Sequence, residues 1–307
     1  MGIPRRLERQ SGRHSLVDGI PFVLPVTSSR SPALMAAFPI DADRAAELLP
    51  GNELHVVRFG RTGLLLVTVI DYRQTIIGKY VEYSIGIGCT RGPRPAPLPL
   101  AALFRKRYGF GQYVIDLPVS SEVSVKGGKG IWGMPKHQAN LDFEITESSV
   151  RSRYDLDGRM VVEVEIQRPG YERFPVRASA VNWCAYRGML MKSDIHFKGR
   201  MGFSLRKPGS ARITLGDHPR ADVLRRLKIS ERPLFSAFLP ETAGTLDDHV
   251  ESWFLSYSAP PEARLEGFES VIGLGLSQEW LPAPGSAAAA TAPKRQMNLG
   301  AAHGIVS

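Results

Sequence analysis

The sequence predicts an α+β fold that is mainly β, with antiparallel strands and a few short helices. Thirty glycines and 23 prolines interrupt a chain of 307 residues, and most apolar segments between them are short and alternate with polar residues. A hydrophobic content of 43% is enough for a sizeable core. We expect four regions along the chain: a basic N-terminal arm (1–20), one β-rich domain (21–258), a C-terminal extension (259–281) and a low-complexity tail rich in alanine, proline and glycine (282–307).

The first half of the domain shows strand-like segments around one short helix. Strands are expected at 21–26, 33–38, 54–59, 64–70 and 78–88. Asp41 is a suitable N-cap for a helix over Asp43–Leu49, which Pro50 and Gly51 would end. Residues 91–112 begin with a proline-rich run that excludes regular structure, so we expect a long excursion from the sheet, a lid or a partner surface.

The second half continues the pattern with a meander. Strands are expected at 113–117 and 121–126, and a three-strand meander with one wet face at 139–147, 149–154 and 160–166. Strand 211–215 leads to Asp217 and Pro219, which predict a helix over Arg220–Leu227. Further apolar segments lie at 233–239 and 250–257.

Charge and cysteine content narrow the classes of function. The net charge is +9, but the basic residues are scattered rather than interleaved with aromatic residues, so we expect no nucleic-acid partner. The only cysteines, Cys89 and Cys184, form no metal-ligand motif and indicate a reduced, cytoplasmic chain. The dispersed histidines predict no metal site, and no apolar run is long enough to predict a membrane span.

One stretch, Gly127–Ile145, is the strongest candidate for chemistry. Its glycine-rich start leads to Trp132, Met134 and Pro135, and then to Lys136 at the start of a strand. Apolar surroundings disfavour the charged form of an amine, and a neutral lysine is a nucleophile toward carbonyl groups. Trp132 and Met134 would line the substrate site and desolvate the amine. Alternatively, Lys136 is a solvated turn residue.

Four other residues complete the candidate set. Glu82 lies mid-strand among apolar neighbours and is either an acid/base partner of an amine or an outward-facing carboxylate. Arg30 and Arg58 are candidates for binding a substrate carboxylate, or are surface charges. His137 adjoins Lys136, but along a strand the two side chains would point to opposite faces, so His137 would flank the site.

The spacing of these motifs resembles the acetoacetate decarboxylase family. The segment from Tyr113 to Lys136, with a strand after it, resembles the region of the family's Schiff-base lysine, which follows a proline. Gly78-Lys79-Tyr80-Val81-Glu82 looks like the family's Gly-x-Tyr-x-Glu strand, which carries the active-site glutamate. Segments 33–50, 211–219 and 235–239 resemble the family's early strand and helix and its closing elements, so the resemblance covers about residues 20–255.

The resemblance implies an antiparallel β-cone or barrel-like double sheet that forms a homo-oligomer. It implies that Lys136 forms an imine, that Glu82 is the acid/base or orients the amine, and that Arg30 lies near the substrate carboxylate. The implied function is a cofactor-free lyase that decarboxylates a β-keto acid, acetoacetate or a larger analogue.

Two positions depart from the family pattern. His137 stands where the decarboxylase has a second lysine, and the strand at 64–70 lacks the expected second glutamate. Relatives with such changes can be aldolase-dehydratases acting on keto acids, which is one alternative with the same lysine. A non-catalytic protein that binds small acids is the other.

Overall fold

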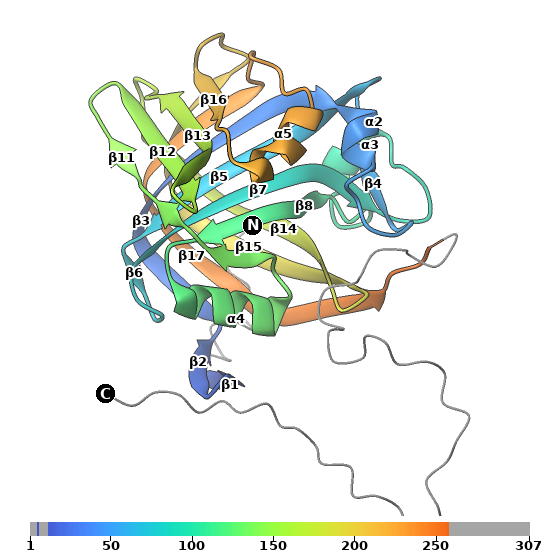
Figure 1. Cartoon of the computed structure of the whole chain (residues 1–307), viewed down its shortest axis with the longest axis vertical. Coiled ribbons are helices and arrows are strands. Elements are labelled where there is room, and N and C mark those ends of the chain that lie inside the picture. The colour runs from blue at the N-terminus through green and yellow to red at the C-terminus, as the bar shows by residue number, and fades with distance from the viewer. Residues whose placement is uncertain (1–4, 6–11, 258–307) are drawn as a thin grey trace, which may run out of the picture. The chain divides into compact units, whose positions relative to one another are not determined.

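Most of the described chain forms a closed β-barrel. The structure is a computed structural model that describes residues 5 and 12–257 (Figure 1). The seven barrel strands follow one another in space and close through the β7–β8 pair; in order they are β7 (Tyr80–Arg91), β5 (Thr62–Tyr72), β3 (Val26–Asp41), β17 (Phe235–Phe254), β15 (Met189–Leu205), β14 (Phe174–Tyr186) and β8 (Gly111–Val119). The predicted mainly β fold is confirmed.

Short strands extend the barrel sheet at its margins. These are β4 (Leu54–Val56), β6 (Gln74–Thr75) and β9 (Lys136–Gln138). Neighbouring barrel strands are antiparallel except where β14 runs parallel to β8, and β9 also pairs with β8 in parallel. A two-stranded hairpin, β1 (Arg13–Val17) and β2 (Ile20–Leu24), lies beside one end of the barrel, within and just after the stretch expected to be a basic arm (Figure 1).

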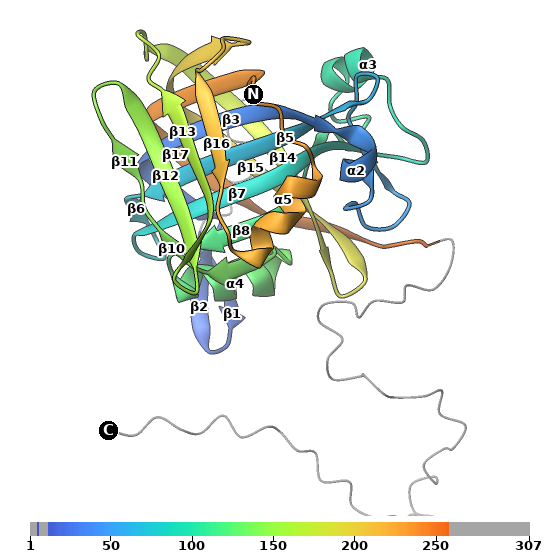
Figure 2. The ribbon, with the colours of Figure 1, turned by 45° about the horizontal axis from the view of Figure 1, so that its top comes forward.

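A second, smaller sheet covers one outer side of the barrel. Its strands are β10 (Asn140–Leu141), β11 (Glu144–Ile145), β12 (Ser149–Leu156), β13 (Arg159–Gln167) and β16 (Ala211–Leu215). Figure 2 shows β12, β13 and β16 in front of β3, β5 and β7. The predicted meander is present, and β16 adds a strand to it.

The main hydrophobic core lies between this sheet and the barrel wall. Val67 and Tyr83 of the barrel pack with Tyr154 and Val162 of the small sheet, and all four are at most 1% exposed. Full burial of a valine side chain stabilises the folded state by about 1.5–3 kcal/mol. Side chains alternate along a strand, so the barrel residues that flank Val67 and Tyr83 in sequence point into the barrel.

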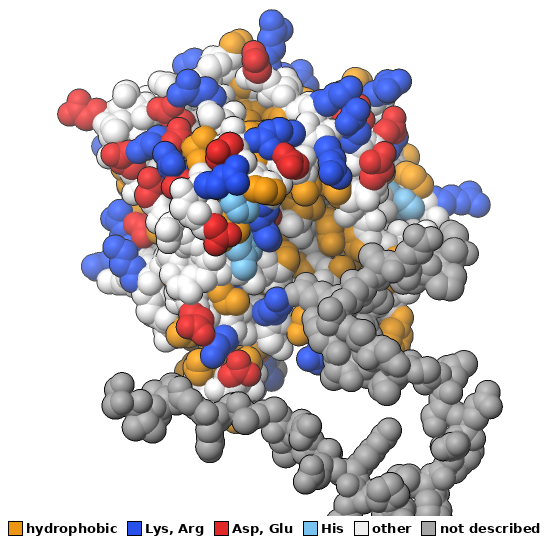
Figure 3. Space-filling model, in the orientation of Figure 1, with side chains coloured by type: hydrophobic (Ala, Val, Ile, Leu, Met, Phe, Trp, Pro, Cys, Tyr) orange, Lys and Arg blue, Asp and Glu red, His pale blue; other side chains and the backbone are white. Residues whose placement is uncertain are grey.

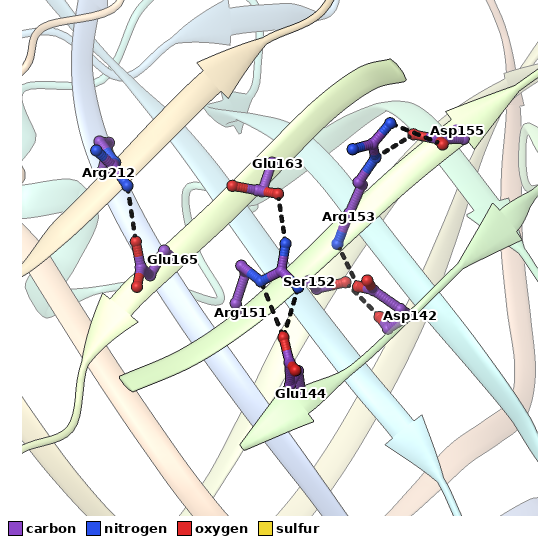
Figure 4. Close-up of polar contacts among 9 residues, drawn as sticks. All are labelled: Asp142, Glu144, Arg151, Ser152, Arg153, Asp155, Glu163, Glu165 and Arg212. Carbon is purple, nitrogen blue, oxygen red and sulfur yellow. Dashed lines mark hydrogen bonds and ion pairs between the residues drawn. The ribbon is translucent and has the colours of Figure 1, made fainter. Parts of the chain in front are cut away.

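The outward face of the small sheet carries paired charges. Figure 4 shows Arg151 between Glu144 and Glu163, and Arg212 against Glu165. On the face seen in Figure 3, basic and acidic side chains are intermingled. This arrangement fits the predicted wet face, and exposed pairs of this kind add little stability.

The helices are short and lie at the ends of strands. They are α2 (Ala42–Ala46), α3 (Leu98–Leu103), α4 (Glu122–Trp132), the 3₁₀ turn η1 (Pro219–Ala221) and α5 (Asp222–Arg226). Asp41 caps α2 as predicted, because its Oδ1 accepts hydrogen bonds from the backbone N–H groups of Asp43 and Arg44. None of these helices has the length and apolar character needed to cross a membrane.

One predicted strand is a helix in the structure. The strand expected at 121–126 is replaced by helix α4, which begins at Glu122 and also contains Gly127, Gly128 and Gly130. The helix is followed by a C-cap, Gly133, with φ 63°. The apolar segments at 233–239 and 250–257 both overlap one long strand, β17, which has register shifts near its middle. The expected excursion holds α3 and lies between the end of β7 and the start of β8. The predicted extension 259–281 and tail 282–307 lie outside the described residues.

Candidate active site

Lys136 reaches the barrel interior past helix α4. It begins β9, directly after Pro135, and pairs with Leu117 of β8. A Cβ added at Gly128 would lie 2.4 Å from Cδ of Lys136 and 2.6 Å from its Cε. Only a glycine therefore lets the lysine side chain pass this close to the helix. The lysine is 6% exposed, so the alternative of a solvated turn residue is excluded.

Three side chains surround the Lys136 amine. Its Nζ donates a hydrogen bond to Oε2 of Glu82 at 2.6 Å and another to Oγ of Ser124 at 2.9 Å. The ring centroid of Tyr80 is 5.7 Å from Nζ, within range of a cation–π interaction. Glu82 therefore faces the amine rather than solvent, and both groups are within proton-transfer distance.

Two tyrosines beside Glu82 are held in the neutral form. The rings of Tyr80 and Tyr72 are in contact, with centroids 4.7 Å apart and planes tilted by 30°. Burial, and then the charge of Glu82, raise the pKa of each phenol well above 10.0. Both hydroxyl groups stay protonated at neutral pH, so neither is the base that deprotonates Lys136.

A small cavity opens beside the amine. It measures about 50 Å³ and is bounded by Lys136, Glu82 and Tyr80, by apolar side chains such as Met134, and by hydroxyl groups such as Thr245. A neighbouring interior cavity of about 100 Å³ shares a wall with it; the residues common to both are Ser28, Tyr72, Glu82, Asn182, Ile195 and Gly244. The two cavities therefore lie side by side in the barrel interior, and the second extends the space next to the amine.

Met134 and Trp132 occupy different positions. Met134 is 3% exposed and lines the Lys136 cavity. Trp132 is 2% exposed but packs behind that wall, in a cluster with Met134, Leu117 and Cys184, and its Nε1 donates to the carbonyl of Asp247 at 2.9 Å. Trp132 thus supports the cavity wall rather than lining the cavity.

His137 points to the outer side of the barrel, opposite to Lys136. Its Nε2 lies 2.8 Å from the hydroxyl of Tyr154, and its Nδ1 is 3.5 Å from Asp116 and 3.3 Å from Nη2 of Arg220. Arg220 in turn forms two hydrogen bonds with the Asp116 carboxylate. These contacts fix β9 from outside, so His137 lies away from the cavity.

Replacing His137 with glutamine should make stability less sensitive to acid. Burial holds the pKa of His137 below its ordinary 6.5, with Asp116 opposing and Arg220 adding to the shift. As pH falls, the unfolded chain therefore binds this proton before the native chain does, and stability is lost below pH 6.5. Urea unfolding at about pH 7.5 and about pH 5.5 should show a smaller loss in the variant than in the parent. Equal losses would contradict this expectation.

The two predicted arginines lie outside the cavity. Arg30 is exposed on β3 and lines a different hollow, on the outer wall of the barrel. Arg58 pairs with Asp43 at 3.0 Å and donates to the carbonyl of Ala42, so it ties the chain to helix α2. Neither lines the cavity that holds the lysine.

Sequence reasoning missed several groups around the amine. Tyr80 could have been found, because residues two apart on a strand share a face and Tyr80 precedes Glu82 by two. Ser124 gave no signal, since its segment was expected to be a strand. Asn182 comes from β14, far along the chain, and only the closure of the barrel brings it to the cavity.

Comparison with known proteins identifies the family. A family model described as acetoacetate decarboxylase (ADC) matches residues 9–183, more than half of the chain. The chain therefore belongs to the acetoacetate decarboxylase family, a family of enzymes. No curated protein sequence matches the chain.

Solved structures share the fold at low sequence identity. The acetoacetate decarboxylase of Legionella pneumophila is 14% identical, with a TM-score of 0.53 over 76% of this chain and 87% of that chain. The enduracididine biosynthesis enzyme MppR, complexed with pyruvate, is 15% identical, with a TM-score of 0.53 over 74% of this chain and 90% of that chain. An acetoacetate decarboxylase-like enzyme from Sphingomonas wittichii RW1 is 14% identical, with a TM-score of 0.50 over 75% and 94%. At such identities the likeness is one of fold.

Proposed function

We propose that the protein is a lyase that decarboxylates a β-keto acid through an imine formed on Lys136. The observation that carries the proposal is the buried Lys136 amine held 2.6 Å from the Glu82 carboxylate. An amine must be neutral to attack a carbonyl carbon, and a carboxylate at this distance is placed to take its proton.

The first stage is imine formation. Glu82 takes a proton from the Lys136 ammonium, and the free electron pair of Nζ attacks the ketone carbon. The resulting carbinolamine loses its hydroxyl group as water, with a proton returned by Glu82, and leaves a cationic iminium. Ser124 orients Nζ through its hydrogen bond, and the face of the Tyr80 ring stabilises the positive charge.

The second stage is carbon–carbon cleavage. The bond between the α-carbon and the carboxylate breaks, its electron pair moves toward the iminium, and carbon dioxide leaves. Glu82, which has meanwhile taken up a proton from solvent water, gives this proton to the α-carbon of the enamine. Water then hydrolyses the new iminium, which releases the ketone and regenerates the Lys136 ammonium. Every proton in this cycle passes between the substrate, water, Lys136 and Glu82.

The cavity lining favours loss of a carboxylate. Apart from Lys136, no cationic residue of the described chain lines either interior cavity. The apolar residues that line the cavity beside Lys136 include Leu117, Met134 and Ile195. A carboxylate next to such walls is poorly solvated, whereas departing carbon dioxide is neutral, so the surroundings favour cleavage.

An aldolase-dehydratase is the second candidate function. The observation in its favour is the adjoining cavity of about 100 Å³, where Gln112 donates to Asn182 at 2.9 Å beside Glu82. This space and its amide groups suit an aldehyde that an enamine on Lys136 would attack. The enzyme MppR, which was solved with the condensation product of pyruvate and imidazole 4-carboxaldehyde, has the same fold.

One experiment tests imine formation and separates the two reactions. The protein is incubated with acetoacetate, or with pyruvate and an aldehyde, and reduced with borohydride. We expect a mass adduct on Lys136 and release of carbon dioxide from acetoacetate. Carbon–carbon bond formation without carbon dioxide release would favour the aldolase-dehydratase, and binding without any adduct would indicate a non-catalytic protein.

Replacing Glu82 with glutamine should lower kcat/KM by about 10²–10⁴-fold. The amide keeps the shape of the side chain but cannot take the proton from Lys136. Glu163→Gln is the matched control, since Glu163 lies on the small sheet and pairs with Arg151. Steady-state rates of carbon dioxide release measure the effect, and an undiminished rate in Glu82→Gln would remove the carboxylate from the mechanism.

A further inference from the structure

A second hollow lies on the outer wall of the barrel. It has a volume of about 950 Å³ and is bounded by residues of β3, β14, β15 and β17 and by the segment before β14. Lys198 lines it, whereas the preceding residue, Phe197, lines the interior cavity. Because successive side chains of a strand point to opposite faces, this hollow lies on the other side of the barrel wall. Thr242 borders both the hollow and the interior cavity of about 100 Å³, whereas no residue lines both the hollow and the Lys136 cavity.

The hollow is strongly basic. Five cations line it: Arg30, Arg173, Arg177, Lys198 and Arg200. Within residues 12–257, none of their side chains forms an ion pair or a hydrogen bond with another residue of the chain. Of its two carboxylates, Glu172 is bound by Arg168 through two hydrogen bonds of 2.8 and 2.9 Å, which leaves Glu241 to offset the five positive charges.

The strand register concentrates these charges. Arg177 of β14 stands directly opposite Lys198 of β15, and like charges at directly opposite positions destabilise a sheet. Gly199 lies between Lys198 and Arg200, where an added Cβ would come within 2.5 Å of the Glu241 carbonyl oxygen. The glycine therefore lets β17 pack closely at the floor of the hollow.

Arg30 is held there by an unusual backbone conformation. Its φ of 50° lies in the left-handed region, which is unfavourable for a residue with a side chain. It occupies the place where the pairing of β3 with β17 shifts register, between the Thr242–Ser31 and Gly244–Ser28 pairs. Such irregular positions persist where the surrounding structure enforces them and are common at binding sites.

We propose that this hollow binds a multiply charged phosphate anion, a polyphosphate or a phosphate ester. Guanidinium groups bind phosphate oxygens through paired hydrogen bonds, and the hollow has the size of a small-molecule site. The hollow holds four arginines and a lysine, and only Glu241 offsets their charge. This is more positive charge than is needed to bind a keto acid, which has a single carboxylate. The site is thus independent of the keto-acid chemistry at Lys136.

Calorimetric titration of the full chain with inorganic tripolyphosphate tests the proposal. The Arg177→Gln/Lys198→Gln variant should bind the anion at least about tenfold more weakly than the parent. Lys79→Gln/Arg94→Gln is the control, because both residues are exposed and lie outside the hollow. Like Arg177→Gln/Lys198→Gln, it removes two positive charges. It should bind like the parent. Binding should also weaken as salt concentration rises.

Three further measurements separate the possible outcomes. Arg173→Gln changes a residue outside the strands, so it should weaken binding without disturbing the sheet. Lys136→Ala should bind tripolyphosphate as the parent does, which separates this proposal from that of the active site. Tighter binding of ATP than of tripolyphosphate would identify a nucleotide ligand, and equal binding would identify the phosphate chain. The proposal is overturned if the parent does not bind either anion, or if the control loses as much affinity as the Arg177→Gln/Lys198→Gln variant.

Discussion

Replacing Lys136 with arginine should abolish imine formation and lower the rate of keto acid turnover by at least about 10⁴-fold. A guanidinium group keeps the positive charge beside Glu82 but has no nucleophilic amine at working pH. Because the charge is retained, the carboxylate is not left buried without a partner, and the fold should survive. Borohydride reduction in the presence of acetoacetate, followed by mass spectrometry, should show no adduct on this variant.

Lys126→Arg provides the matched control. Lys126 lies on helix α4, near the site, but pairs with Glu122 and Asp18 on the outside of the helix. It should give the parent's adduct and the parent's rate of carbon dioxide release. If the Lys136→Arg variant keeps its activity, the amine is not the nucleophile and the proposed function is wrong.

The sequence predicted the mainly β fold because its signals were local. The alternation along β12 and β13 and the Asp41 cap need only a few neighbouring residues, and all are present as expected. Closure of the barrel could not be predicted in this way. It depends on β7 pairing with β8 and β14 with β8, contacts that no short pattern encodes.

The positions of side chains in the candidate site could be predicted where they follow from the alternation of side chains along a strand. Lys136 and His137 point to opposite faces, as expected from adjacent strand positions, and Glu82 faces the amine. Arg30 was placed by resemblance, and the structure puts it on the outer wall instead. Ser124 was missed because glycines and β-branched residues disfavour helices, a preference that packing overrides in α4.

Replacing Gly128 with alanine should lower the rate of imine formation by about 10²-fold while leaving the protein folded. Alanine is favoured over glycine in a helix by about 1 kcal/mol, so α4 itself should gain stability. The new methyl group, however, would occupy the space of the Lys136 side chain, 2.4 Å from its Cδ. The lysine must bend away, and its Nζ would leave the positions bonded to Glu82 and Ser124.

Gly130→Ala separates this effect from a general change in the helix. The two glycines share helix α4, but a Cβ at Gly130 would meet Cγ1 of Val17 in β1, at 2.6 Å, rather than the lysine. This control should disturb the hairpin contact and keep the parent's rate of borohydride trapping. Urea unfolding of both variants shows whether each is folded. If Gly128→Ala traps the keto acid as fast as the parent, close packing against α4 does not position the amine, and the glycine-rich run serves the hairpin alone.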